Sequence, residues 1–127
     1  MSSLAARHVS VPLQRLAWAA VFAGSLVAAV VLDAGAWQLW ALLVAPDATL
    51  FVGAGRGLEK GRLHPRAVPL YNALHRPVGP IGLAIASIWL GPEWLVGSLA
   101  WLAHISVDRA VGYGLRDARG YVIKRAG

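Results

Sequence analysis

Four side chains that can bind a metal ion lie within or next to the most apolar stretches of this sequence: Asp47, His75, His104 and Asp108. Ionisable groups at membrane depth cost about 3 kcal/mol each on insertion scales, so they usually mark a function or a specific packing partner. His104 and Asp108 are four positions apart, which places both on one face of a helix. One helix could therefore supply two ligands to a metal ion, with Asp47 and His75 as two more from facing helices.

These four side chains would suit a metal ion that catalyses hydrolysis. Two imidazoles and two carboxylates suit Zn²⁺, Mn²⁺ or Fe²⁺ better than Ca²⁺ or copper. A water molecule in an open coordination position would make a hydrolytic centre, with Asp47 as base and Arg76 or Arg109 holding an anionic substrate. We expect a lipid or isoprenoid phosphate as substrate, approached from the inner leaflet. The residues expected to support this polar layer are Tyr71, Asn72 and Tyr113.

A second interpretation needs no metal and no reaction. Asp47 could pair with Arg109 or Arg76, and His104 could donate to a carbonyl, because charges inside a membrane bundle usually neutralise one another. The spacing H-x-x-x-D is by itself a weak signal. On this interpretation the protein is a non-catalytic membrane subunit or assembly factor, and its polar cluster fixes helix packing. The sequence leaves both interpretations open.

Composition indicates that these residues belong to an integral membrane protein. Hydrophobic residues make up 57% of the 127 residues and charged residues only 14%, against about 25% charged in a soluble domain. Cysteine is absent, which excludes thiolate ligands and disulfides. We predict one all-α domain over 1–127, an antiparallel bundle whose third helix is kinked by Pro77 and Pro80. The predicted transmembrane helices are 16–32, 34–55, 68–90 and 94–115.

Basic residues predict the orientation of this bundle. Lys and Arg lie in the N-terminal tail, in the loop 56–67 and in the tail 116–127, and the two short turns carry none. Because positive charge favours the cytoplasmic side, we expect both termini and the loop to be cytoplasmic, in a bacterial inner membrane. Asp47, His75 and Asp108 would then lie roughly 10–12 Å inside the cytoplasmic boundary, at 1.5 Å per residue.

The same topology accounts for the net charge of +6. No nucleic-acid motif accompanies the charge, so we expect no nucleic-acid partner. The expected partners are membrane lipids, with anionic headgroups attracted to the basic cytoplasmic face. A homo-oligomer or a larger membrane complex is also compatible with the sequence.

Three segments resemble a known family. APDAT (45–49), LYNALHRPVGP (70–80) and WLAHISVDRAVGYGL (101–115) are similar to the signature of a small bacterial membrane-protein family, domain of unknown function 4260. That resemblance implies a four-span inner-membrane protein and supplies no established activity. A more distant resemblance is to the DNA-damage-inducible membrane-bound metal-dependent hydrolases, which carry Pro-Asp, a His-rich segment and H-x-x-x-D in this order. Those hydrolases have a second Asp where this chain has Thr49, and more histidines than His75 alone.

Overall fold

The computed structural model describes residues 3–52, 58 and 61–123, and the described part is all-α. Two 3₁₀ turns, η1 and η2, interrupt the α-helices. The elements are α1 (Ser3–Asp33), α2 (Trp37–Val44), η1 (Ala45–Asp47), α3 (Ala48–Val52), η2 (Pro65–Ala67), α4 (Val68–Leu74), α5 (Val78–Leu90) and α6 (Pro92–Ala110).

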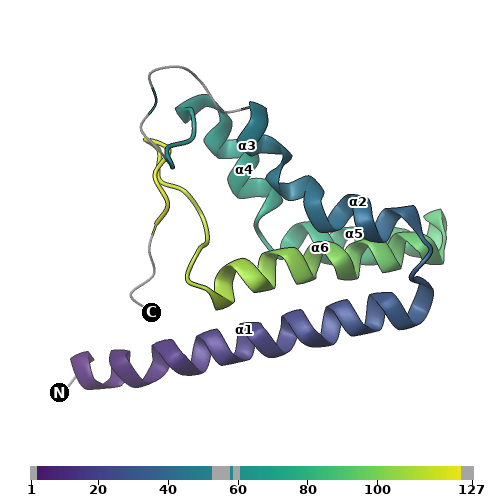
Figure 1. Ribbon diagram of the computed structural model, residues 1–127, viewed down its shortest axis with the longest axis horizontal. Coiled ribbons are helices and arrows are strands. Elements are labelled where there is room, and N and C mark those ends of the chain that lie inside the picture. The colour runs from purple at the N-terminus through teal and green to yellow at the C-terminus, as the bar shows by residue number, and fades with distance from the viewer. Residues whose placement is uncertain (1–2, 53–57, 59–60, 124–127) are drawn as a thin grey trace.

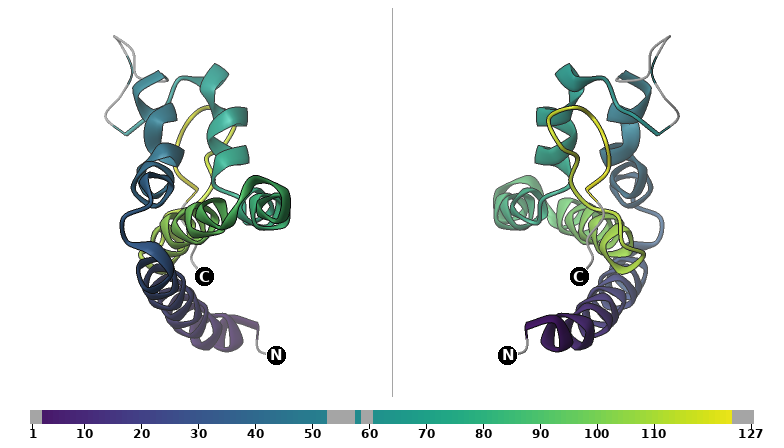
Figure 2. Two further views of the ribbon diagram at one scale, coloured as in Figure 1. Left: turned by 90° about the vertical axis from the view of Figure 1, so that its right-hand side faces the viewer. Right: turned by 90° about the vertical axis from the view of Figure 1, so that its left-hand side faces the viewer.

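Helix α6 is the centre of the fold, and it packs against α1, α2 and α5 (Figures 1 and 2). The turn from α1 to α2 and the turn from α5 to α6 lie at one end of the molecule (Figure 1). The N-terminus and the segment after α6 lie at the other end. Small side chains allow the close approach of α1, α2 and α6. The buried cluster at this interface is Ala29, Ala36, Leu39, Val96 and Ala100.

The α1–α2 turn is short, as predicted from the sequence. The carboxylate of Asp33 accepts a hydrogen bond from the Gly35 N–H at 3.0 Å, which closes an Asx turn. The Trp40 indole N–H donates to the Ala34 carbonyl at 2.9 Å and fixes the first turn of α2 against it. The chain therefore reverses direction between α1 and α2, and both helices pack against α6.

The second and third predicted spans are each divided into shorter helices. Pro46 lies at the start of η1, where the missing backbone donor of proline is not needed, and the chain changes direction into α3. Pro77 separates α4 from α5, because a proline disfavours helical geometry in the residue before it. Pro80 lies in the first turn of α5, which tolerates proline, so α5 continues through it and the interruption lies at Pro77 instead of at both prolines. Both interruptions occur beside the predicted ligands.

Helix α6 ends at Ala110, five residues before the predicted end of the fourth span. The Tyr113 N–H bonds to the Asp108 carbonyl at 2.8 Å, and the Gly112 N–H bonds to the Arg109 carbonyl at 3.3 Å. Gly112 has a φ of 95°. These features form a Schellman cap, which requires a left-handed residue and favours glycine there. The sequence G-Y-G thus terminates the helix directly after the predicted site.

Among the described helices, α1 alone is both long and apolar enough to cross a membrane. Its apolar part, Val11–Asp33, has 23 residues and a mean hydropathy of 2.0, and only 11% of its most apolar stretch is buried inside the protein. Helix α5 is apolar but has 13 residues, fewer than the roughly 20 that a span needs. By length and composition α1 is suited to crossing a membrane, a property shared by core helices of soluble proteins and by signal sequences.

The loop and the C-terminal tail pack together, which the sequence did not predict. The loop 56–67 was predicted only as a basic cytoplasmic connection, but its Leu63 is 2% exposed. The Leu63 N–H donates to the Gly120 carbonyl at 2.9 Å, and the Arg116 guanidinium donates to the carbonyls of Gly61 and Gly120. The tail turns at 117–120, where N–H groups of Tyr121 and Arg119 hold the pKa of Asp117 below its usual value.

Gly120 should therefore be intolerant of a side chain. Its φ is 98°, and a Cβ atom there would collide with the Leu63 backbone. We expect Gly120→Ala to lower the free energy of unfolding by about 1–3 kcal/mol and to speed proteolysis of the tail. Gly24→Ala is the control, because space is open around Gly24. Equal protease resistance of the two variants would contradict the observed packing.

Candidate metal centre

The two helix interruptions place the predicted ligands around one point. Asp47 ends η1, His75 follows α4, and His104 and Asp108 lie one turn apart on α6. One ligand atom from each residue can be chosen so that all four lie within 4.8 Å of one another. The residues predicted from the sequence as metal ligands thus form a single cluster, which could hold a metal ion.

The distances in the cluster join each imidazole to both carboxylates. The His75 Nε2 atom lies 3.1 Å from Asp47 Oδ1 and 3.5 Å from Asp108 Oδ2. The His104 Nε2 atom lies 3.2 Å from the same Asp47 oxygen and 3.4 Å from the same Asp108 oxygen. Ligands about 2.0–2.1 Å from a zinc ion at the corners of a tetrahedron would be about 3.3–3.4 Å apart. The four nitrogen-to-oxygen distances are close to that spacing.

The other ring nitrogen of each histidine is hydrogen-bonded to the backbone. The His75 Nδ1 atom lies 2.8 Å from the Tyr71 carbonyl, and the His104 Nδ1 atom lies 2.7 Å from the Leu43 carbonyl. A carbonyl can only accept, so both Nδ1 atoms must carry hydrogen. In a neutral ring the lone pair is then on Nε2 and faces the carboxylate oxygens, whereas a protonated His75 ring donates from Nε2 to Asp47 Oδ1 at 3.1 Å. The neutral form has the tautomer and orientation of histidine in metal sites.

Burial differs between the imidazoles and the carboxylates. The side chains of His75 and His104 are 1% and 10% exposed, whereas those of Asp47 and Asp108 are 41% and 23% exposed. The His104 Nε2 atom is fully buried and has no hydrogen-bond partner of acceptable geometry among the described residues. A buried polar atom without a partner is costly. The cluster is therefore closed on the histidine side and accessible on the carboxylate side.

A second layer of contacts fixes the orientation of His75. The Tyr71 ring stacks on the His75 ring with centroids 3.9 Å apart and an interplanar angle of 18°. The Arg116 guanidinium lies 4.9 Å from the Tyr71 centroid. Asn72 exchanges two hydrogen bonds with the Arg116 backbone, at 2.8 and 2.9 Å. Tyr71 thus contacts His75 directly, and Arg116 of the C-terminal tail contacts both Tyr71 and Asn72.

The other predicted site residues lie in different surroundings. Arg109 contacts the Trp18 ring at 5.6 Å and donates to the His75 carbonyl at 3.3 Å, so it lies beside the cluster. The exposed Arg76 side chain makes no hydrogen bond or ion pair within the described ranges. Tyr113 is 54% exposed and contributes its backbone to the α6 cap. The catalytic roles given to these residues remain predictions.

The comparisons with known proteins identify one matching family. The family model described as Domain of unknown function (DUF4260) matches residues 12–124. The chain belongs to this family. The matched range contains all four ligands and both supporting residues, Tyr71 and Asn72. No curated protein and no solved structure matches the chain.

The position at which the hydrolases have a second carboxylate is occupied by Thr49. This side chain is 3% exposed, and its hydroxyl donates to the Pro46 carbonyl at 3.1 Å. Thr49 therefore stabilises the turn that presents Asp47. The resemblance to metal-dependent hydrolases remains a prediction that rests on the order of the motifs.

Proposed function

We propose that this chain binds one divalent metal ion through Asp47, His75, His104 and Asp108, and that it uses the ion to hydrolyse a phosphate ester of a membrane lipid or isoprenoid. The observation that carries the proposal is that backbone carbonyls hold both Nδ1 atoms, which leaves both Nε2 atoms facing the same two carboxylates. With hydrogen on Nδ1, two nitrogen lone pairs and two carboxylates converge. A cation is the partner that satisfies four converging acceptors at once.

Charge balance favours the same conclusion. Two neutral imidazoles and two ionised carboxylates carry a charge of about −2, which is costly in a site that is partly removed from water. A divalent cation cancels this charge. Zn²⁺, Mn²⁺ and Fe²⁺ are the candidates, because imidazole favours transition metals over Ca²⁺ or Mg²⁺.

The unequal burial of the ligands supports a catalytic use of the metal. The carboxylates are exposed enough for a substrate or water to reach the ion from their side. A bound metal ion would lower the pKa of a water molecule, which would attack phosphorus as hydroxide after a carboxylate accepts its proton. The ester P–O bond would break, and the lipid alcohol would leave with the proton returned by that carboxylate. Asp47, the more exposed carboxylate, is the proposed base through Oδ2, because its Oδ1 faces the two histidines. Arg109 lies next to Asp108 in the chain, and Arg76 lies next to His75, so either could bind the phosphate.

The class of substrate that we propose follows from the proposed membrane location. We propose that the protein lies in a bacterial inner membrane with four spans and with both termini cytoplasmic. Helix α5 also carries exposed apolar side chains, which supports lipid contact by α5 in addition to α1. They include Val78, Ile81, Ile85, Ile88 and Trp89. A site reached from this surface would take amphiphilic phosphates in preference to water-soluble ones.

A non-catalytic role is favoured by one feature of the cluster. Its members come from three separate segments, so the same contacts also hold η1 and the end of α4 against α6. A metal or hydrogen-bond network used only for packing would require the same residues. The two roles differ in turnover, which the following experiment measures.

The test of the proposed hydrolase is phosphate release from a lipid phosphate in mixed micelles containing the purified protein. We expect Asp47→Asn to lower the rate about a hundredfold or more, because both a ligand charge and the base are lost. Asp33→Asn is the matched control, since Asp33 is exposed in the α1–α2 turn, far from the cluster along the chain. Release that is absent, or equal in the two variants, would overturn the hydrolase proposal and favour the packing role.

A further inference from the structure

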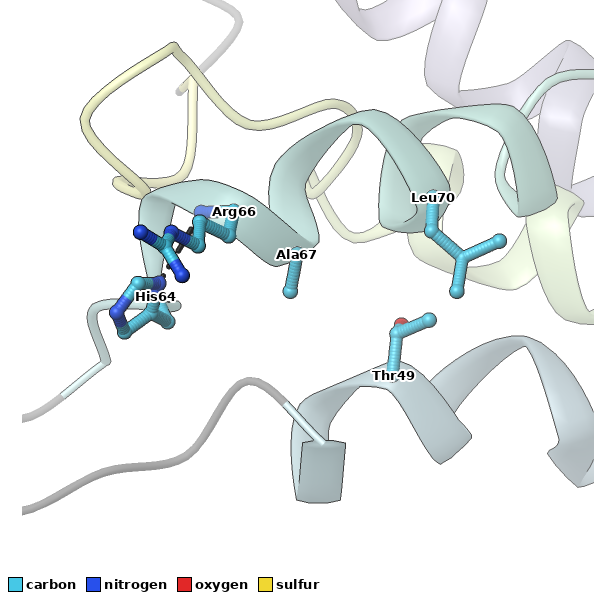
Figure 3. A pocket seen from close by; sticks show the side chains of 5 residues that line it. All are labelled: Thr49, His64, Arg66, Ala67 and Leu70. Carbon is cyan, nitrogen blue, oxygen red and sulfur yellow. Dashed lines mark hydrogen bonds between the residues drawn. The ribbon is translucent and has the colours of Figure 1, made fainter.

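A second feature next to the metal centre is a pocket of about 330 Å³ between α3 and α4. Thr49 on α3 and Leu70 on α4 face each other across it, and Arg66 and His64 lie at its other end (Figure 3). Its volume is within the range of small-ligand sites. The remaining lining residue is Ala67, so none of the described residues that line the pocket is a carboxylate.

We infer that this pocket binds the anionic phosphate headgroup of a membrane lipid. The inference is independent of the metal centre and goes beyond the proposed hydrolysis, because it concerns a site without metal ligands. The polar end of the pocket would contact the phosphate, and the apolar side would contact the start of the acyl chains.

The polar end offers hydrogen-bond donors without competing partners. The Arg66 N–H donates to His64 Nδ1 at 3.1 Å, so that nitrogen must accept, and the hydrogen of the neutral ring lies on Nε2. The Arg66 side chain is exposed and has no ion pair within the described residues. A guanidinium and an imidazole N–H together suit a phosphate, which accepts charge-assisted hydrogen bonds from both.

The apolar side favours a lipid over a free phosphate ion. The Thr49 hydroxyl is already bonded to Pro46, which leaves no strong donor on this side. Leu70 is 53% exposed, and Phe51 on α3 is 85% exposed. Inorganic phosphate would gain nothing from this apolar surface, whereas the glycerol and acyl carbons of a lipid would bury it. A headgroup beside η2, at the start of α4, also agrees with the predicted basic cytoplasmic face.

The test uses the full-length protein in uncharged detergent micelles, with dioleoyl phosphatidic acid as probe and native mass spectrometry to count bound lipid. We expect one phosphatidic acid per chain, preferred over dioleoyl phosphatidylcholine. Arg66→Gln should weaken this binding about tenfold, the loss expected for one charge-assisted contact. Arg119→Gln should have little effect, since it removes the same charge from a side chain that is 78% exposed on the tail.

A second pair of variants leaves the charge of the protein unchanged and tests the apolar side of the pocket. Leu70→Gln should weaken binding of phosphatidic acid, and Leu90→Gln should not, although both leucines are 53% exposed. If the two variants of either pair weakened lipid binding equally, the lipid would be held by attraction spread over the surface and not by this pocket, and the inference would be overturned. Displacement of the lipid by millimolar inorganic phosphate would also overturn it, in favour of a soluble anion. Metal content is measured on the same samples, so that the two proposals can be tested separately. Protein that contains metal but does not bind the lipid contradicts this inference and leaves the metal-site proposal standing.

Discussion

His104→Ala is expected to lower the affinity of the protein for its metal by at least 10–100-fold, the loss already caused by changing outer-shell partners in metal sites. The imidazole of His104 is oriented by the Leu43 carbonyl, and its Nε2 lies within 3.4 Å of oxygens from Asp47 and Asp108. Alanine removes one ligand and leaves the remaining three with an excess of negative charge. The measurement is the metal-to-protein ratio after purification in mild detergent.

Two further variants make this result interpretable. Asp108→Asn keeps the size of the side chain and removes its charge, so it should also lose metal even if His104→Ala disturbs the packing near Leu43. His64→Ala is the matched control, because His64 is an exposed histidine outside the cluster. Wild-type metal content in folded His104→Ala and Asp108→Asn protein would contradict the assignment of these ligands.

Removing the metal by chelation should destabilise the folded protein. The ligands come from η1, the end of α4 and α6, and they meet only in the folded chain. An ion that binds the native state alone stabilises it by about 2.7 kcal/mol when its free concentration is a hundred times the dissociation constant. We expect a corresponding fall in the free energy of unfolding, measured by titration with a denaturing detergent, and recovery when the metal is added back.

The variant Asp108→Asn is the control for the chelation experiment as well. If chelation acts through the cluster, the free energy of unfolding of this variant should hardly respond to chelator. A response equal to that of the wild type would place the stabilising ion elsewhere. If neither protein responds, the cluster holds its helices by hydrogen bonds alone, as the packing interpretation requires.

The cluster itself could be predicted because it depends on few features of the sequence. Apolar segments, short turns and the i, i+4 spacing of His104 and Asp108 are local properties. Charge counting then placed Asp47, His75 and Asp108 at a common depth. The structure brings these side chains together, although it does so by interrupting two helices. The prediction of a kink at Pro77 was correct, and Pro46 has the equivalent role in the second segment.

The contacts of the tail could not be predicted from local patterns. The sequence analysis counted Arg116 only as one of the basic residues of the tail, but its backbone is bound by Asn72 and its guanidinium by the carbonyls of Gly61 and Gly120. The contacts of Arg116 with Asn72 and Gly61 join residues 44 and 55 positions apart. Neither hydropathy nor charge patterning predicts contacts between residues so far apart in the sequence. The only local signal was Gly120, whose φ of 98° is one that other residues rarely adopt.

X-ray absorption at the metal edge, on wild-type protein purified without added metal, tests the central claim most directly. The account predicts one ion per chain, with about two imidazole nitrogens and light oxygen ligands near 2.0–2.1 Å if the ion is zinc. The spectrum should lose imidazole scattering in His104→Ala protein that retains any metal. Folded wild-type protein that contains no metal, and takes up none when Zn²⁺, Mn²⁺ or Fe²⁺ is supplied, would contradict the account.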